Sequence, residues 1–243
     1  FLVPRRLKNA ALLLVSLFFY AWGEPKYVVL MLVSIAQGYL FGLLVEKYRG
    51  RNASRLFLSL SILVSLGLLG YFKYADFFLA SVNAATGLSL PLLKLTLPIG
   101  ISFYTFQVLS YVIDVYRGET AAQRSFIDLA AYVSLFPQLI AGPIVRYSDV
   151  AAELSDRTHS LSGAADGARR FVTGLCKKVL LANQFGSLAA ACKQAQEASA
   201  LFVWLYALAF LLQVYFDFSG YSDMAIGLGR ILGFHFPENF KDR

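Results

Sequence analysis

Seven long stretches without a charged residue recur along this chain of 243 residues, and they constrain its fold more than any other feature. A helix that crosses the hydrocarbon core of a bilayer needs about 20 mostly apolar residues. The uncharged stretches are residues 9–23, 27–45, 56–72, 95–113, 129–145, 179–192 and 198–216. The sequence therefore predicts an all-α, polytopic membrane helix bundle with about seven to nine helices, some of them broken or interfacial.

Composition supports the same class. Hydrophobic residues make up 58% of the chain and charged residues only 15%, whereas soluble domains carry about 25% charged residues. A folded soluble monomer of this composition would expose large apolar areas to water. The composition therefore argues against a soluble globular enzyme, and the economical interpretation is a single membrane domain over residues 1–243.

The uncharged stretches differ in how well they match a membrane span. Residues 27–45, 56–72, 95–113 and 198–216 are predicted as full spans, with Pro98 and Gly100 opening the third. Residues 9–23 form a shorter one. Pro137 and the pair Gly142 and Pro143 predict a kinked or broken helix within 129–145. Residues 179–192 are predicted as a partly submerged amphipathic helix.

The net charge of +7 comes from basic residues that gather in particular connections. Lys47, Arg49, Arg51 and Arg55 follow the second stretch, whereas residues 73–94 carry Lys only at their two ends. Because cytoplasmic loops of membrane proteins are rich in Lys and Arg, this alternation predicts a multi-pass inner-membrane protein with these basic loops in the cytoplasm. Residues 72–96 would lie outside, with a short interfacial helix. Membrane lipid, and not nucleic acid, is the predicted partner.

Ionisable residues near the apolar stretches are functional candidates, because charge at membrane depth is unfavourable. Asp114 and Arg117 are three residues apart, which predicts an interfacial ion pair. Four further cations are predicted to anchor a helix to anionic headgroups or, alternatively, to attract the phosphates of a donor such as coenzyme A. They are Arg169, Arg170, Lys177 and Lys178.

The most unusual segment follows the last apolar stretch, where carboxylates, hydroxyls and phenols surround Gly220. The candidate cavity-lining residues are Tyr215, Asp217, Ser219, Tyr221 and Asp223. Irregular backbone at membrane depth is tolerated where it lines a hydrated cavity. The alternative is that Asp217, Ser219 or Ser222 caps a new helix over residues 223–232. The sequence leaves both interpretations open, and they are compatible.

The residues indicate no recognisable catalytic or metal site. His159 lies in a polar connection and His235 follows the last apolar segment, and both are interpreted as non-catalytic. Cys176 and Cys192 have no metal-ligand spacing and are interpreted as small apolar residues. No bound cofactor and no metal are predicted.

Several ordered motifs, however, resemble the membrane-bound O-acyltransferase family, and specifically its bacterial branch that is similar to alginate O-acetyltransferase. The resembling segments are residues 97–107 (LPIGISFYTFQ), 111–118 (YVIDVYRG), 136–146 (FPQLIAGPIVR), the Lys177 and Lys178 pair, 215–229 (YFDFSGYSDMAIGLG) and 238–240 (ENF). With gaps, the similarity runs from about Arg5 to the end of the chain. The motifs are specific for the family and much less so for the polysaccharide that is modified.

The resemblance implies a membrane enzyme with a tunnel, which passes an acetyl group from a cytosolic thioester donor, acetyl-CoA or an acyl carrier, toward an exopolysaccharide. Alginate is the leading acceptor, with cellulose, peptidoglycan or D-alanyl transfer to teichoic acid as alternatives. Periplasmic acetyltransferase partner proteins would complete the transfer. The family's central His is expected in a Trp-Arg-Arg-Trp-His type motif beyond Arg243, so this chain is expected to be part of a longer protein and no catalytic residue is assigned within it.

Two other classes stay open. Intramembrane carboxylates and broken helices also occur in small-solute transporters and channels, and a structural assembly subunit is a third interpretation. A Trp-His motif within about one helix beyond Arg243 would favour acyl transfer, whereas further plain spans without His would favour transport.

Residues 1–243 by themselves are predicted to transfer no acetyl group, because the expected catalytic His lies outside them. The measurement is transfer of labelled acetyl from a thioester donor by the purified segment, with the full-length protein as the positive control. Transfer by the segment alone would contradict the prediction.

Overall fold

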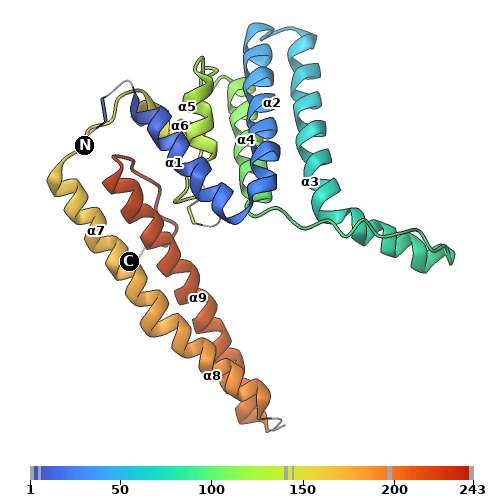
Figure 1. The fold of residues 1–243 in the computed structure, drawn as a ribbon, viewed down its shortest axis with the longest axis vertical. Helices are drawn as coiled ribbons and strands as arrows, with labels where there is room; N and C mark the ends of the chain where they lie inside the picture. Colours follow the sequence, from blue (N-terminus) through green and yellow to red (C-terminus); the bar gives the residue numbers. More distant parts are fainter. Residues whose placement is uncertain (1–2, 5–6, 140–141, 144, 196–198, 241–243) are drawn as a thin grey trace. The chain divides into compact units, whose positions relative to one another are not determined.

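The computed structural model describes residues 3–4, 7–139, 142–143, 145–195 and 199–240, and within these residues every regular element is helical (Figure 1). The prediction of an all-α fold is therefore confirmed. The elements are α1 (Lys8–Gly23), the 3₁₀ turn η2 (Pro25–Tyr27), α2 (Val28–Lys47), α3 (Asn52–Thr86), α4 (Ile101–Arg117), α5 (Phe126–Val133), α6 (Tyr147–Ser155), α7 (Leu161–Cys176), the π-helical segment η3 (Lys177–Ala182), α8 (Asn183–Gln194) and α9 (Ala200–Ile231).

Within the described part of the chain, three segments are long and apolar enough to cross a membrane, judged by length and composition: Pro25–Lys47, Asn52–Thr86 and Ala200–Ile231. They contain the predicted spans 27–45 and 56–72, and the predicted span 198–216 from residue 200 onward. α1 covers the shorter stretch 9–23. These predictions of helices are confirmed.

The predicted span 95–113 is wrong in its first part. Helix α4 begins only at Ile101, because Gly100 takes a left-handed conformation with φ of +75°. A Cβ atom at Gly100 would lie 2.7 Å from the carbonyl oxygen of Leu139, so both the conformation and the space require glycine. Pro98 precedes the helix and does not stand in its first turn. α4 is consequently a short, largely buried helix of 17 residues.

Three further predicted stretches can be compared with the structure, and one of the three predictions is wrong. The broken helix in 129–145 is confirmed, because α5 ends at Val133, before Pro137; residues 140, 141 and 144 of this stretch lie outside the described part. The separate short helix predicted in 72–96 is wrong, because α3 continues without interruption to Thr86 and ends at Gly87, which has φ of +71°. The stretch 179–192 is helical, as η3 and α8.

The chain divides into two compact units, and the single domain over residues 1–243 stays a prediction. In the first unit, which holds α1 to α5, helices α2 and α4 pack closely through glycines of α2. A Cβ at Gly38 would lie 2.5 Å from a methyl group of Val108, and one at Gly42 would lie 2.8 Å from the ring of Tyr111. The Asn9 amide ties α1 to α5 by donating to the Asp128 carboxylate at 2.7 Å.

The second unit is built on a helical hairpin in which α7, η3 and α8 run against α9 (Figure 1). Two glycine pairs lie between α7 and α9: a Cβ at Gly167 would lie 2.6 Å from the carbonyl oxygen of Gly227, and one at Gly174 would lie 2.4 Å from that of Gly220. Between the two contacts the residue number rises from 167 to 174 on α7 and falls from 227 to 220 on α9, so the two helices are antiparallel. Backbone contacts of this closeness are typical of membrane helices joined through small residues.

Gly174→Ala should destabilise the second unit by about 1–3 kcal/mol, because the added methyl group meets backbone atoms of α9 that cannot move aside. Thermal unfolding of the full-length protein in detergent measures the effect. Gly67→Ala is the matched control: it lies on α3, where no atom would lie within 4 Å of the new Cβ, and it should leave the unfolding temperature unchanged or raise it. Equal effects of the two substitutions would contradict the close packing.

Candidate functional site

Ionisable side chains of α7 and η3 meet carboxylates of α9 on both sides of Gly220. A Cβ at Gly220 would lie 3.2 Å from Cβ of Lys177 and 3.2 Å from the backbone nitrogen of Lys178, so glycine lets η3 approach α9 closely. Asp217 and Asp223 stand three residues before and after this contact point. Each is therefore about one helical turn from the lysine pair, one in each direction.

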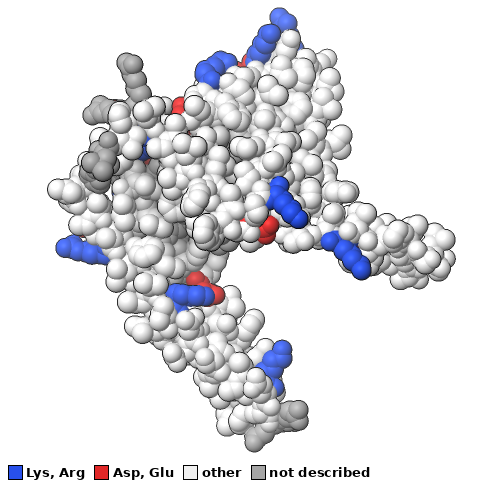
Figure 2. Space-filling view, in the orientation of Figure 1, with Lys and Arg blue, Asp and Glu red and all other residues white. Residues whose placement is uncertain are grey.

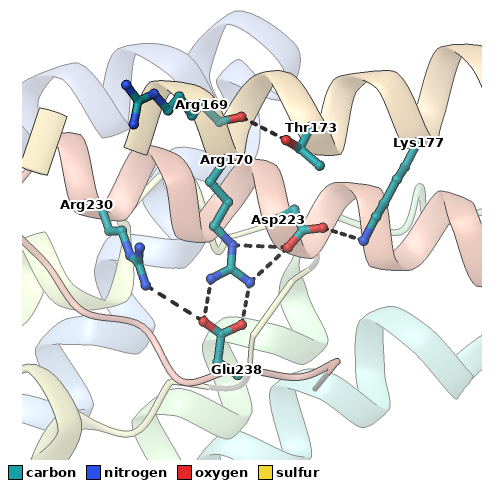
Figure 3. A network of polar contacts seen from close by, with 7 residues as sticks. All are labelled: Arg169, Arg170, Thr173, Lys177, Asp223, Arg230 and Glu238. Carbon is teal, nitrogen blue, oxygen red and sulfur yellow. Dashed lines mark hydrogen bonds and ion pairs between the residues drawn. The ribbon is translucent and has the colours of Figure 1, made fainter. Parts of the chain in front are cut away.

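The larger part of the network surrounds Asp223 (Figure 3). Arg170 donates to Oδ1 of Asp223 from Nε at 3.1 Å and from Nη2 at 2.9 Å. Lys177 donates from Nζ to the other oxygen, Oδ2, at 2.8 Å. The side chain of Asp223 is only 14% exposed, and those of Arg170 and Lys177 are 21% and 24% exposed. Two cations thus compensate one largely buried carboxylate, as burial of charge requires.

Glu238 joins the same network from the segment that follows α9. Both of its oxygens accept from the guanidinium of Arg170 in a bidentate pair, and Arg230 Nη2 lies 4.0 Å from Oε1 (Figure 3). The hydrogen bond to Glu238 raises the pKa of Arg170, so the guanidinium stays charged. Phe240 packs edge-on against Tyr215, with ring centroids 5.7 Å apart. The segment after α9 is thereby fixed to the helix.

Lys178 pairs with Asp217 on the other side of Gly220. Successive residues of an α-helix point about 100° apart, so two neighbouring lysines seldom both reach one partner helix. The π-helical turn of η3 carries both of them here. Single π-helical turns inside α-helices are frequent at functional sites.

The five predicted site residues all lie on α9, but they differ in burial and in the residues they contact. Asp217 and Asp223 hold the ion pairs, Ser219 is buried, Tyr221 is partly buried and Tyr215 is exposed beside Phe240. The Oγ atoms of Ser219 and Ser222 are buried and have no hydrogen-bond partner among the described residues. An open hollow of about 300 Å³ is lined by Val214, Asp217, Phe218 and Tyr221. The role of the five residues as the lining of a functional cavity stays a prediction.

The capping interpretation of this segment is wrong. α9 runs unbroken from Ala200 to Ile231, so no new helix starts near Asp223 and neither Asp217, Ser219 nor Ser222 is an N-cap. Gly220 does not break the helix, since its missing side chain serves the contact with η3. Tertiary packing explains this glycine, where the sequence suggested a break.

The interpretation of the basic residues as headgroup anchors also needs correction. Arg170, Lys177 and Lys178 are paired with carboxylates within the unit, as described above. Arg169 is the most exposed of the four, with a side chain that is 83% exposed and an Nη1 atom 3.5 Å from Asp166, and the side chain of Lys178 is 40% exposed. The sequence did carry a signal for these pairs, because ionisable groups within apolar helices must find partners of opposite charge.

The predicted ion pair of Asp114 and Arg117 is not formed. Arg117 Nη1 lies 3.6 Å from Glu119 Oε1, whereas Asp114 is buried and its Oδ2 has no hydrogen-bond partner among the described residues. Spacing on one helix face permitted the pair, but the turn after α4 brings Glu119 to the same arginine.

The two histidines and two cysteines take no part in the network. His235 is exposed between the buried Phe234 and Phe236, and His159 lies in the connection before α7. Cys192 is partly buried and Cys176 is exposed, and their interpretation as small apolar residues stays a prediction. The described residues contain no group of three or more side chains that could hold a metal ion.

The positive and negative charges of the network nearly cancel, so its role is to hold the helices together. Arg170, Lys177 and Lys178 face Asp217, Asp223 and Glu238, and each of these six charges takes part in at least one ion pair. Such an arrangement fixes α7, η3, α9 and the segment after α9 with respect to one another. It can position the hollow on α9 and whatever follows Glu238 in the chain.

Asp223→Ala should lower the free energy of unfolding of the second unit by about 3 kcal/mol, because Arg170 and Lys177 lose a largely buried counter-charge. Asp166→Ala is the control on an exposed pair, and it should change stability by less than about 1 kcal/mol. Unfolding of the full-length protein in detergent compares the two. A small effect of Asp223→Ala would show that the network does not stabilise the hairpin.

Comparison of the chain with known proteins shows to which family it belongs. The family model of the membrane-bound O-acyltransferases, MBOAT, matches residues 121–243, which include α7, η3, α8 and α9. The chain is 47% identical to a probable alginate O-acetylase AlgI of Pseudomonas syringae pv. tomato, over 99% of this chain and 48% of that protein. It is 46% identical to a probable alginate O-acetylase AlgI of Pseudomonas aeruginosa, over 99% of this chain and 47% of that protein.

A peptidoglycan O-acetyltransferase of Helicobacter pylori is 35% identical, over 94% of this chain and 49% of that protein. The chain thus spans about half the length of the curated relatives it matches. The resemblance found in the motifs is confirmed by these matches, and the chain belongs to the membrane-bound O-acyltransferase family.

Proposed function

We propose that the protein containing this chain is a multi-pass O-acyltransferase of the bacterial inner membrane, which acetylates an exopolysaccharide, most specifically alginate. The observation that carries the proposal is the 47% identity to a probable alginate O-acetylase over 99% of this chain. The match to a peptidoglycan O-acetyltransferase is lower, at 35%. Both names share O-acetyl transfer to a polysaccharide, and the difference in identity favours alginate.

The donor in this proposal is a cytosolic thioester, acetyl-CoA or an acyl carrier, and the acetyl group passes through the membrane domain. The physical reason is that a neutral acetyl group is far less unfavourable in a low-dielectric passage than the charged donor. Periplasmic acetyltransferase partners then receive the group and modify hydroxyls of the polymer. Over the whole scheme one thioester bond of the donor is broken and one ester bond to a polymer hydroxyl is formed, and the proton of that hydroxyl is balanced by the thiol that the donor releases.

The residues of this chain act as scaffold in the proposal. The ion pairs of Arg170 and Lys177 with Asp223 hold α7 against α9, and Glu238 extends the network to the segment that leads to Arg243. The expected His lies beyond that residue, so this network would position the approach to the catalytic centre. The hollow beside Asp217 and Tyr221 would be part of the passage.

Deletion of the full gene should remove ester-linked acetate from secreted alginate, while the amount of polymer stays unchanged. The measurement is acetate released by mild alkali per uronic acid, with the full-length gene returned on a plasmid as the positive control. Loss of acetate from peptidoglycan alone would replace alginate by peptidoglycan as the acceptor. Unchanged acetate on both polymers, with altered uptake of a small solute, would overturn acyl transfer in favour of a transporter.

A further inference from the structure

A basic pocket lies where α2 ends and α3 begins, in the first compact unit. It has a volume of about 240 Å³, and its lining includes Arg49, Arg51, Asn52, Arg55 and Tyr116. Gly50, between the first two arginines, has φ of +81°, which lets the chain turn sharply there. The connection thus brings three guanidinium groups to one pocket.

These arginines are not neutralised by the protein. In the segments that the structure describes, no carboxylate lies within ion-pair distance of Arg49, Arg51 or Arg55, although Arg124 and Arg170 do have such partners. Arg51 is the N-cap of α3 and Arg55 lies in its first turn, so both charges stand at the positive end of the helix dipole, which repels them. An anion in the pocket would remove this repulsion.

Backbone groups and a fixed guanidinium favour the same anion. The N-cap of α3, Arg51, has an extended conformation and makes no capping hydrogen bond with its side chain. The free N–H groups of a helix start and its dipole attract negative charge. Arg49 is held in place by donating from Nη2 to the carbonyl oxygen of Val115 at 2.6 Å. Three positive side chains and an uncapped helix start therefore converge.

The surface below the pocket indicates that the anion belongs to a lipid. Leu56, Leu60 and Leu63 follow on α3 and are 58%, 37% and 69% exposed. α3 is long and apolar enough to cross a membrane. Figure 2 shows basic atoms gathered over the end where α2 joins α3, next to an uncharged surface. In a bilayer crossed by α3, the pocket would lie at headgroup level, with leucines placed for acyl chains.

We propose that the pocket at the α2–α3 junction binds the phosphate of an anionic phospholipid headgroup, while the acyl chains cover the exposed leucines of α3. Guanidinium groups suit phosphate oxygens because they form paired, charge-assisted hydrogen bonds. A soluble phosphate offers the same headgroup chemistry but no acyl chains. The two sources therefore differ in whether the apolar surface contributes to binding.

The test titrates the detergent-solubilised full-length protein with phosphatidylglycerol, phosphatidylcholine or inorganic phosphate and measures the unfolding temperature, which a ligand raises when it binds the folded state. Phosphatidylglycerol should bind at least about tenfold more tightly than phosphatidylcholine. Inorganic phosphate at equal concentration should give little stabilisation. Equal stabilisation by phosphate and phosphatidylglycerol would overturn the assignment to lipid.

The pocket variant is Arg51→Gln with Arg55→Gln, and the control with the same loss of charge is Lys73→Gln with Lys94→Gln, at two exposed residues outside the pocket. The pocket variant should lose the preference for phosphatidylglycerol, and the control should keep it. Without lipid, the pocket variant should unfold at an equal or higher temperature, because it lacks two positive charges at the positive end of the α3 dipole. That reading also verifies that the variant is folded.

A pocket variant that folds and retains the preference for phosphatidylglycerol would overturn the proposal, and so would an equal loss in both variants, since overall charge would then explain the binding. Arg55→Gln alone serves if the double variant does not fold, and an intermediate loss is expected. None of these outcomes depends on acyl transfer, so the failure of this proposal and that of the proposed function are distinguishable.

Discussion

Backbone contact between α7 and α9 is the constraint on which the second unit depends. Gly167 and Gly174 face Gly227 and Gly220 so closely that a methyl group would not fit at either place. This closeness brings Arg170 and Lys177 within hydrogen-bond distance of Asp223. In apolar surroundings such charges are tolerated only when they are paired. The glycines and the ion pairs thus require one another.

The two units differ in whether their basic residues are paired with carboxylates. The cations of α7 and η3 are compensated by carboxylates of α9 and by Glu238, which leaves the network nearly neutral. At the α2–α3 junction, three arginines share a pocket without a carboxylate in its lining. The first arrangement stabilises packing within the protein, because every charge is satisfied there. The second leaves positive charge available for a ligand of opposite sign.

Some features of the site could be read from the sequence and others could not. Asp217 and Asp223 were recognised as candidates because carboxylates beside an apolar stretch are rare. Their partners were missed, since Arg170, Lys177 and Lys178 lie 39 to 53 residues away along the chain. Glu238 belongs to the sequence motif of residues 238–240, which indicates no role for it, and only the packing of the segment after α9 against the hairpin shows its pairing with Arg170.

The sequence by itself determined the helical class, the apolar segments and the family, because the length and composition of a membrane helix and several ordered motifs are local properties of the chain. Tertiary structure decided where α4 begins, why α9 continues through Gly220 and which charges are paired. Each of these depends on a contact with a distant segment: Gly100 with Leu139, Gly220 with Lys177 and Lys178, and Arg170 with Asp223. Local propensity cannot specify such contacts, since they arise only when the helices pack.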